Sequence, residues 1–250
     1  MSHKFEEGKD IIIETVIQQV RTRLLAPQSD LCAEFAHQFF STVALDDLRE
    51  WTIDDLSGCA VDFWSMIEKR APGEVKIRIF NPDKEQEGWQ TTHTVVEVIC
   101  DDMPFLVDTL RIVINRMGLA LHLVIHMGGI RLTRGPSHEV TAVLPRQGAA
   151  PTPFLTEAPL FLEIDRQTDP TVLAELYRQF SLVLQQNTAV VEDWLQMCER
   201  VRSVIDELDF LPDTIDANEA EESKAFLTWI EDHHFTFLGI RDYELVKSNE

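Results

Sequence analysis

Two adjacent aspartates in a short turn are the residues of this sequence best placed to bind a small molecule. They follow an apolar run and lead, through Met103, Pro104 and Phe105, into a helical pattern. Backbone amides at a helix N-terminus can hold a carboxylate, and a neighbouring acid can accept an amino group, so the turn could bind a small amino acid. The simpler alternative is that Asp102 only caps the helix. The candidate effector-binding residues are Asp101, Asp102, Met103, Pro104, Phe105 and, after the helix, Gly118.

Two histidine patterns could suggest a metal site. His122 and His126 lie four residues apart on a predicted strand, so their side chains face the same way. At roughly 3.3 Å per residue they are ~13 Å apart, too far to share one ion, and we interpret them as strand-surface residues. In Glu231-Asp232-His233-His234 the adjacent histidines point apart, and a helix C-terminal histidine is the simpler interpretation. We therefore predict no metal site.

Catalytic and cofactor motifs are absent from the sequence. It has no glycine-rich dinucleotide loop, no triphosphate-binding loop and no G-x-S-x-G pattern. No cysteine has a plausibly positioned histidine partner. Gly128-Gly129 is better explained as a bulge or bend in a long strand. We predict neither a catalytic residue nor a bound cofactor in this chain.

Charge and cysteine content narrow the class of protein. The 250 residues carry a formal net charge of -21, from 43 acids against 22 bases. This balance argues against nucleic acid and anionic membrane surfaces as partners, because both attract clustered Lys and Arg. No apolar run approaches the roughly 20 residues that span a bilayer, and the polar N-terminus is not a secretory signal. The four widely spaced cysteines predict buried free thiols in a reducing cytoplasm.

The predicted secondary structure that positions the candidate residues changes from helices to strands at Ala71-Pro72-Gly73. Before it, helical spacing of apolar residues predicts a small helical layer, with Asp30 and Thr52 as helix caps. After it, extended apolar runs predict strands over 75–79, 92–100, 119–126, 139–144 and 160–164. A helix over 105–117 is predicted to cross between two adjacent strands, 92–100 and 119–126.

The C-terminal part is predicted to be mainly helical. The stretch 147–159 predicts a surface loop, and a helix begins at Asp169-Pro170. Residues 181–187 could continue that helix or form a short strand. A second helix follows, then an acidic linker and a last strand over 235–240. The predicted organisation is an α+β fold with a helical layer (1–71), an α/β domain (72–187), a helical connector (188–232) and the truncated start of a further β-containing domain (233–250).

Three stretches resemble the N-terminal part of the large bacterial NAD-dependent glutamate dehydrogenases. They are DDMPFLVDTLR (101–111), RMGLALHLVIH (116–126) and HHFTFLG (233–239), and FLEIDR (161–166) and VEDW (191–194) extend the similarity. The order of strand, D-x-P turn, helix, glycine and strand also resembles the ACT domain. That domain is a ferredoxin-like βαββαβ regulatory module that often binds amino acids. The similarity covers most of the chain from about Val95 onward.

The resemblance implies that the full protein oxidatively deaminates L-glutamate to 2-oxoglutarate with NAD. In that family the catalytic lysine and the NAD-binding fold lie far downstream, so this segment is expected to be regulatory or to serve assembly. Its expected partners are its own downstream catalytic domain, further copies in a homo-oligomer and, alternatively, an amino-acid effector. Phe105 stands where amino-acid-binding ACT domains usually have glycine. Its side chain would crowd the turn, which favours a scaffolding role.

Overall fold

The computed structural model describes residues 2–148, 153–212 and 216–243. The chain divides into two compact units, Met1–Leu184 and Gln185–Glu250. The first unit contains a six-stranded sheet with helices packed on it. No helix in the part of the chain just defined is long and apolar enough to cross a membrane.

Four helices form the predicted helical layer: α1 (Ser2–Arg23), α2 (Gln28–Phe40), α3 (Leu45–Arg49) and α4 (Ile53–Ile67). Thr52 caps α4 as predicted, because its Oγ1 accepts a hydrogen bond from the backbone N–H of Asp55 at 3.1 Å. Asp30 does not cap α2. That helix begins at Gln28, with Pro27 at the N-cap. Asp30 therefore lies in the first turn, where the helix dipole favours an acid.

Six antiparallel strands form one sheet: β1 (Lys76–Phe80), β2 (Thr94–Asp101), β3 (Leu121–His126), β4 (Ile130–Arg134), β5 (Val140–Leu144) and β6 (Leu155–Ile164). The order is β1-β2-β6-β4-β5, and β3 also pairs with β6. β2 is an interior strand, as its apolar residues on both faces predict, and only its last residue is exposed.

The predicted crossover is present, but the strands that it joins are not adjacent. α5 (Leu106–Arg116) connects β2 to β3. β6 lies between those strands, with Leu162 opposite both Val96 of β2 and Val124 of β3. The unit is therefore a split βαβ arrangement. β6 suits the central place because its residues from Glu157 to Ile164 are all buried.

The prediction of a surface loop over 147–159 is wrong at its C-terminal end, where Leu155 to Pro159 belong to β6. The loop was predicted from the Ala, Pro, Thr and Gly content of this stretch, but its one acid, Glu157, is buried in the strand. Arg134 donates hydrogen bonds to its two carboxylate oxygens at 2.7 Å each, and Arg70 Nη1 lies 3.0 Å from Oε1. A carboxylate paired in this way can be buried at acceptable cost.

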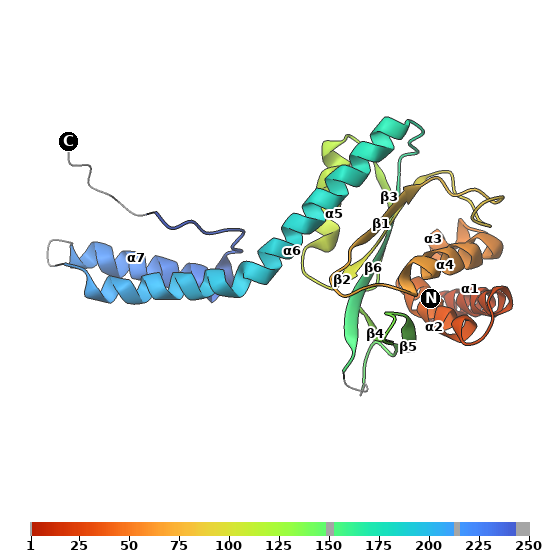
Figure 1. Cartoon of the computed structure of the whole chain (residues 1–250), viewed down its shortest axis with the longest axis horizontal. Coiled ribbons are helices and arrows are strands. Elements are labelled where there is room, and N and C mark those ends of the chain that lie inside the picture. The colour runs from red at the N-terminus through yellow and green to blue at the C-terminus, as the bar shows by residue number, and fades with distance from the viewer. Residues whose placement is uncertain (1, 149–152, 213–215, 244–250) are drawn as a thin grey trace. The chain divides into compact units, whose positions relative to one another are not determined.

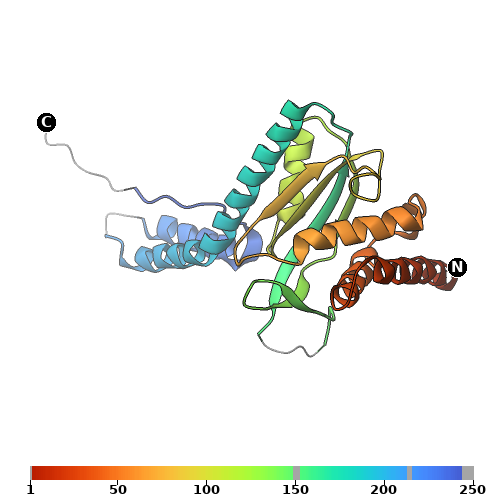
Figure 2. The same cartoon turned by 45° about the vertical axis from the view of Figure 1, so that its right-hand side comes forward.

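The sheet separates two groups of helices (Figure 1), and a hydrophobic core lies on each side of it. α1 to α4 pack on one face around Phe161, whose ring centroid lies 6.1 Å from that of Phe39. α5 and the first part of α6 (Pro170–Glu207) cover the other face, where Leu110 and Phe180 are fully buried. Figure 2 shows the same separation from a second direction, with α1 to α4 across the sheet from α5.

α6 settles the region left open by the sequence, because it runs as helix through 181–187. In a βαββαβ module a strand would follow this second helix. Here β1 already borders β2, with Lys76 opposite Ile99, so an earlier strand occupies that edge. β1 therefore takes the place of the last strand of that module. The ACT-like α+β fold predicted from the sequence is otherwise confirmed.

After α6 come a short 3-10 helix (Leu208–Phe210), α7 (Ala217–Trp229) and a π-helical turn (Ile230–His234). The predicted strand over 235–240 is wrong, since residues 235–243 have no regular secondary structure. Alternating apolar residues need a partner strand to form a stable ladder, and none of the described strands pairs with them. Residues 246–250, in the predicted terminal domain, lie outside the described residues. The predicted domain boundaries remain predictions.

Candidate functional site

The acids of the predicted effector turn make contacts that the sequence did not indicate. Asp101 forms an ion pair with Arg70, whose Nη2 lies 2.7 Å from Oδ1. The backbone N–H of Asp102 donates to the carbonyl oxygen of Thr156 at 3.1 Å. Asp102 does not cap α5, because the N-cap residue is Phe105. The turn is therefore tied to β6 and to Arg70, while the start of α5 has no side-chain cap.

Phe105 has an unusual backbone conformation. Its φ of 69° lies in the left-handed region, which glycine adopts easily and other residues rarely adopt. Its side chain is 46% exposed. Gly118 has the predicted left-handed φ, at 70°. It lies beyond the opposite end of α5, however, and the 11 residues of that helix separate it from the turn by ~16 Å at ~1.5 Å per residue. The structure does not bring Gly118 together with the turn.

The histidine patterns lie in separate surroundings. His126 is half-buried, and its pKa is lowered, mainly by burial; the nearby Asp102 opposes this shift and Arg146 adds to it. The Nδ1 atom of His234 lies 3.0 Å from the carbonyl oxygen of Trp229, and Glu231 accepts a hydrogen bond from Arg202. Across the described ranges, no three His, Cys, Asp or Glu side chains are grouped so that they could hold a metal ion.

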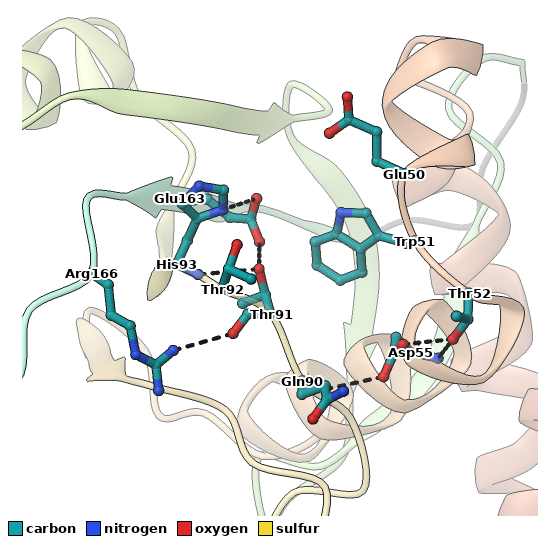
Figure 3. Close-up of a pocket in the computed structure, with 10 residues that line it drawn as sticks. All are labelled: Glu50, Trp51, Thr52, Asp55, Gln90, Thr91, Thr92, His93, Glu163 and Arg166. Atoms are coloured by element: carbon teal, nitrogen blue, oxygen red, sulfur yellow. Dashed lines mark hydrogen bonds and ion pairs between the residues drawn. The ribbon is translucent and has the colours of Figure 1, made fainter.

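A cavity of about 510 Å³ lies where the helical layer meets the sheet (Figure 3). Three separate segments line it: the turn into α4 with the first turn of that helix (50–55), the segment leading into β2 (90–93), and the end of β6 with the following loop (163–166). All three belong to the first unit. Its volume falls within the ~300–1,000 Å³ range of small-molecule sites.

Glu163 is the buried acid on the sheet side of the cavity, and it is only 4% exposed. Thr91 donates its hydroxyl hydrogen to Oε1 at 2.7 Å, and Nδ1 of His93 lies 3.2 Å from Oε2. The His93 ring stacks on His122, with centroids 4.2 Å apart, and Nε2 of His122 lies 2.8 Å from Oδ1 of Asp165. Two carboxylates and two imidazoles thus form one continuous chain of contacts.

Asp165 ends this chain as an ionised carboxylate. Its Oδ2 accepts a hydrogen bond from the backbone N–H of Ala120 at 2.8 Å. That bond, followed by the contact with His122, lowers the pKa of Asp165. The negative charge of Asp165 therefore faces the paired histidine rings at neutral pH.

The helical side of the cavity is held rigid by its own contacts. Asp55 is 7% exposed and accepts hydrogen bonds from the Thr52 hydroxyl at 2.5 Å and from the backbone N–H of Gln90 at 3.1 Å. The indole of Trp51 stacks on Trp89, with centroids 5.6 Å apart and an interplanar angle of 19°. Figure 3 shows this indole projecting toward Thr91 and Glu163. A preformed cavity of this kind suits a small ligand.

Comparison with known proteins identifies the family. The family model described as "Glutamate dehydrogenase, ACT1 domain" matches residues 35–180. The chain belongs to the glutamate dehydrogenase ACT1 family. It is 34% identical over 242 residues to the NAD-specific glutamate dehydrogenase of Halomonas elongata, and 33% identical over 233 residues to that of Pseudomonas aeruginosa. These alignments include 96% and 93% of this chain, but the chain spans only 15% and 14% of the relatives' length.

The resemblance to glutamate dehydrogenases noted in the sequence is thereby confirmed. The ACT1 match includes both the predicted turn and every residue that lines the cavity. The sequence analysis did not predict the cavity, because the segments that line it are far apart along the chain. One usable signal was Glu163, the single charged residue in the predicted strand over 160–164. A second was His122, which we interpreted only as a strand-surface residue. It is exposed on β3, as predicted, and it also stacks on His93 of the cavity wall.

Proposed function

We propose that this chain is a non-catalytic regulatory or assembly segment of an NAD-dependent glutamate dehydrogenase. The full-length enzyme converts L-glutamate to 2-oxoglutarate and ammonia, with NAD as the oxidant. The observation that carries this proposal is the alignment, in which nearly all of this chain matches about one seventh of each NAD-specific relative. The remaining length of such enzymes has room for separate catalytic and NAD-binding domains.

The surface of α7 supports an assembly role. Phe226 and Trp229 are 59% and 51% exposed, and α7 buries none of its residues. Large apolar side chains exposed together often mark contact surfaces. We propose that α7 contacts the downstream catalytic part of a neighbouring copy and so helps to hold a homo-oligomer together.

The location that we propose for this enzyme is the cytoplasm. All four cysteines, Cys32, Cys59, Cys100 and Cys198, are free and buried, which supports a reducing compartment. The net charge of -21 supports partners other than nucleic acid or an anionic membrane surface.

Two measurements test the proposal. The 250-residue chain alone is assayed for NADH formation from L-glutamate, and we expect no turnover; measurable turnover would contradict a non-catalytic role. In the full-length enzyme, the double variant Phe226→Ala, Trp229→Ala is compared with the control Glu222→Ala on the same helix. We expect only the apolar variant to change the particle mass in sedimentation. Identical sedimentation of both variants and the wild type would remove the assembly role of α7.

A second candidate function is effector binding at the turn that begins at Asp101. The left-handed Phe105 at an uncapped helix N-terminus favours it, since such backbone conformations concentrate at functional sites. Isothermal titration with a panel of amino acids tests this, using wild type and Phe105→Gly, which removes the crowding side chain. A binding heat that Asp102→Asn abolishes would support it. Silence in both proteins would eliminate it.

A further inference from the structure

The charges that line the cavity are mostly negative. Glu50, Asp55 and Glu163 contribute three carboxylates, against the single guanidinium of Arg166. Lys84 approaches from outside the lining, with Nζ 3.6 Å from Oδ1 of Asp55, and still leaves one acid in excess. Low-dielectric walls concentrate such a field. The cavity therefore attracts cations and repels anions.

The aromatic wall favours an organic cation. Trp51 is fixed by Trp89 on one side and by Phe161, whose centroid lies 6.1 Å away. Indole is the side chain that best attracts a cation to its face, and it also packs against hydrocarbon. A ligand with an ammonium group and a short carbon chain would use both properties.

The acidic groups are arranged to accept hydrogen bonds from such a ligand. Among the residues that the structure describes, Thr91 contacts Oε1 of Glu163 and His93 contacts Oε2. A carboxylate oxygen can accept a second hydrogen bond. Glu50 is exposed at the cavity edge, and Figure 3 shows its carboxylate separate from the bonded group around Glu163. An ammonium ion has three donors to offer to these acceptors.

We propose that this cavity binds a small organic ammonium ion, with the charged group held by the acidic side chains and the carbon chain against Trp51. The binding goes beyond the role proposed above and does not depend on it, because it is measured on this chain alone. A loss of α7-mediated assembly and a loss of ammonium binding are therefore separate results.

The test uses four probes with the same short carbon chain and different charges: butylammonium, butyrate, 1-butanol and the zwitterion 4-aminobutyrate. Binding is followed through the indole ¹H–¹⁵N signals of the five tryptophans, with the Trp51 signal assigned from Trp51→Phe. A ligand of this size gives a Kd on the order of millimolar. We expect butylammonium to shift the Trp51 signal saturably, and butyrate and 1-butanol to leave it unchanged.

Matched variants locate the binding. Glu50→Gln removes an exposed cavity acid and is expected to weaken butylammonium binding by roughly 3- to 10-fold, as for one partly screened charge contact. Glu14→Gln removes an exposed acid on α1, away from the cavity lining, and is expected to have no effect. Glu163→Gln should weaken binding further, with circular dichroism verifying that it folds.

Three results would overturn the proposal. One is a Trp51 signal that does not respond to butylammonium, and another is butyrate binding equal to or tighter than butylammonium. The third is tighter binding of 4-aminobutyrate than of butylammonium, which would assign recognition to Arg166 and a ligand carboxylate. Equal effects of Glu50→Gln and Glu14→Gln would also count against the cavity, because binding would then follow net charge alone.

Discussion

A buried acid in the centre of the sheet gives a sharp prediction about pH and stability. Glu97 of β2 is fully buried opposite Arg78 of β1, which donates hydrogen bonds to Oε2 at 2.8 and 2.5 Å. Arg78 also donates to Asp62 of α4 at 2.9 Å. The group thus has two acids for one base. Oε1 of Glu97 has no hydrogen-bond partner in the part of the chain that the structure describes.

The pKa of Glu97 is raised from 4.5 to about 8, and burial is the main cause. The attraction of Arg78 opposes the rise, and the repulsion from Asp62 adds to it. The folded protein therefore holds a proton on Glu97 that the unfolded chain releases above about pH 4.5. The free energy of unfolding should then fall as the pH rises from about 4.5 to 8, by up to ~1.4 kcal/mol per pH unit. Over the whole window the loss from this one group is on the order of 5 kcal/mol.

Glu97→Gln isolates the effect, because the amide is neutral at every pH. Urea unfolding is measured for both proteins between pH 5 and 9. We expect the variant to gain stability relative to wild type as the pH rises. Asp62→Asn should make the wild-type slope shallower, since it removes the repelling charge, whereas Glu192→Gln, on the exposed surface, should run parallel to wild type.

The opposite result would refute this reasoning. If Glu97 is a carboxylate in a stable ion pair with Arg78, wild type stays more stable than Glu97→Gln by a constant amount from pH 5 to 9. A gap that widens in favour of wild type at high pH would contradict it even more strongly. Either outcome would show that the two short contacts with Arg78 outweigh the cost of burying the charge.

Three further predictions, on packing and on backbone conformation, are tested by urea unfolding. Phe161→Ala should cost about 3–5 kcal/mol, because it empties the centre of the aromatic core between helices and sheet; a loss below about 1 kcal/mol would contradict that packing. Gly58→Ala should cost about 1–3 kcal/mol, because a Cβ at residue 58 would lie 2.6 Å from the Cβ of Trp89. The control is Gly8→Ala in α1, which should be neutral or stabilising, because its Cβ would meet nothing nearer than 3.6 Å. Phe105→Gly should be more stable than Phe105→Ala by about 1 kcal/mol, because φ is 69°; equal stabilities would count against the left-handed conformation.

Local pattern was sufficient to predict the elements around the central helix. The apolar spacing of Leu106, Leu110, Val113 and Ile114 predicted α5, and all four side chains are buried. The apolar residues on both faces of β2 predicted an interior strand. These predictions succeed because each depends on residues within one or two helical turns or along one strand.

Pairing between distant segments could not be predicted in this way. The place of β6 between β2 and β3 depends on contacts across more than thirty residues of sequence. Glu157 and Glu163 looked like solvent-facing positions until the structure placed arginines, a histidine and a threonine beside them. The cavity was missed for the same reason, since the chemistry of a buried acid is set by partners that no local pattern identifies.

The physical unit of this ACT1 domain is larger than the segment that the family model matches. The match begins at residue 35, in the middle of α2, and excludes all of α1. Yet Ile13, Val16, Ile17 and Val20 of α1 are at most 6% exposed and belong to the same core as Phe161. At ~1.5–3 kcal/mol for each fully buried side chain, α1 contributes on the order of 6–12 kcal/mol of burial. Whole domains are stable by only ~5–15 kcal/mol. The helical layer is therefore part of the fold that shapes the cavity, and a segment cut at the family boundary would lose an essential part of its core.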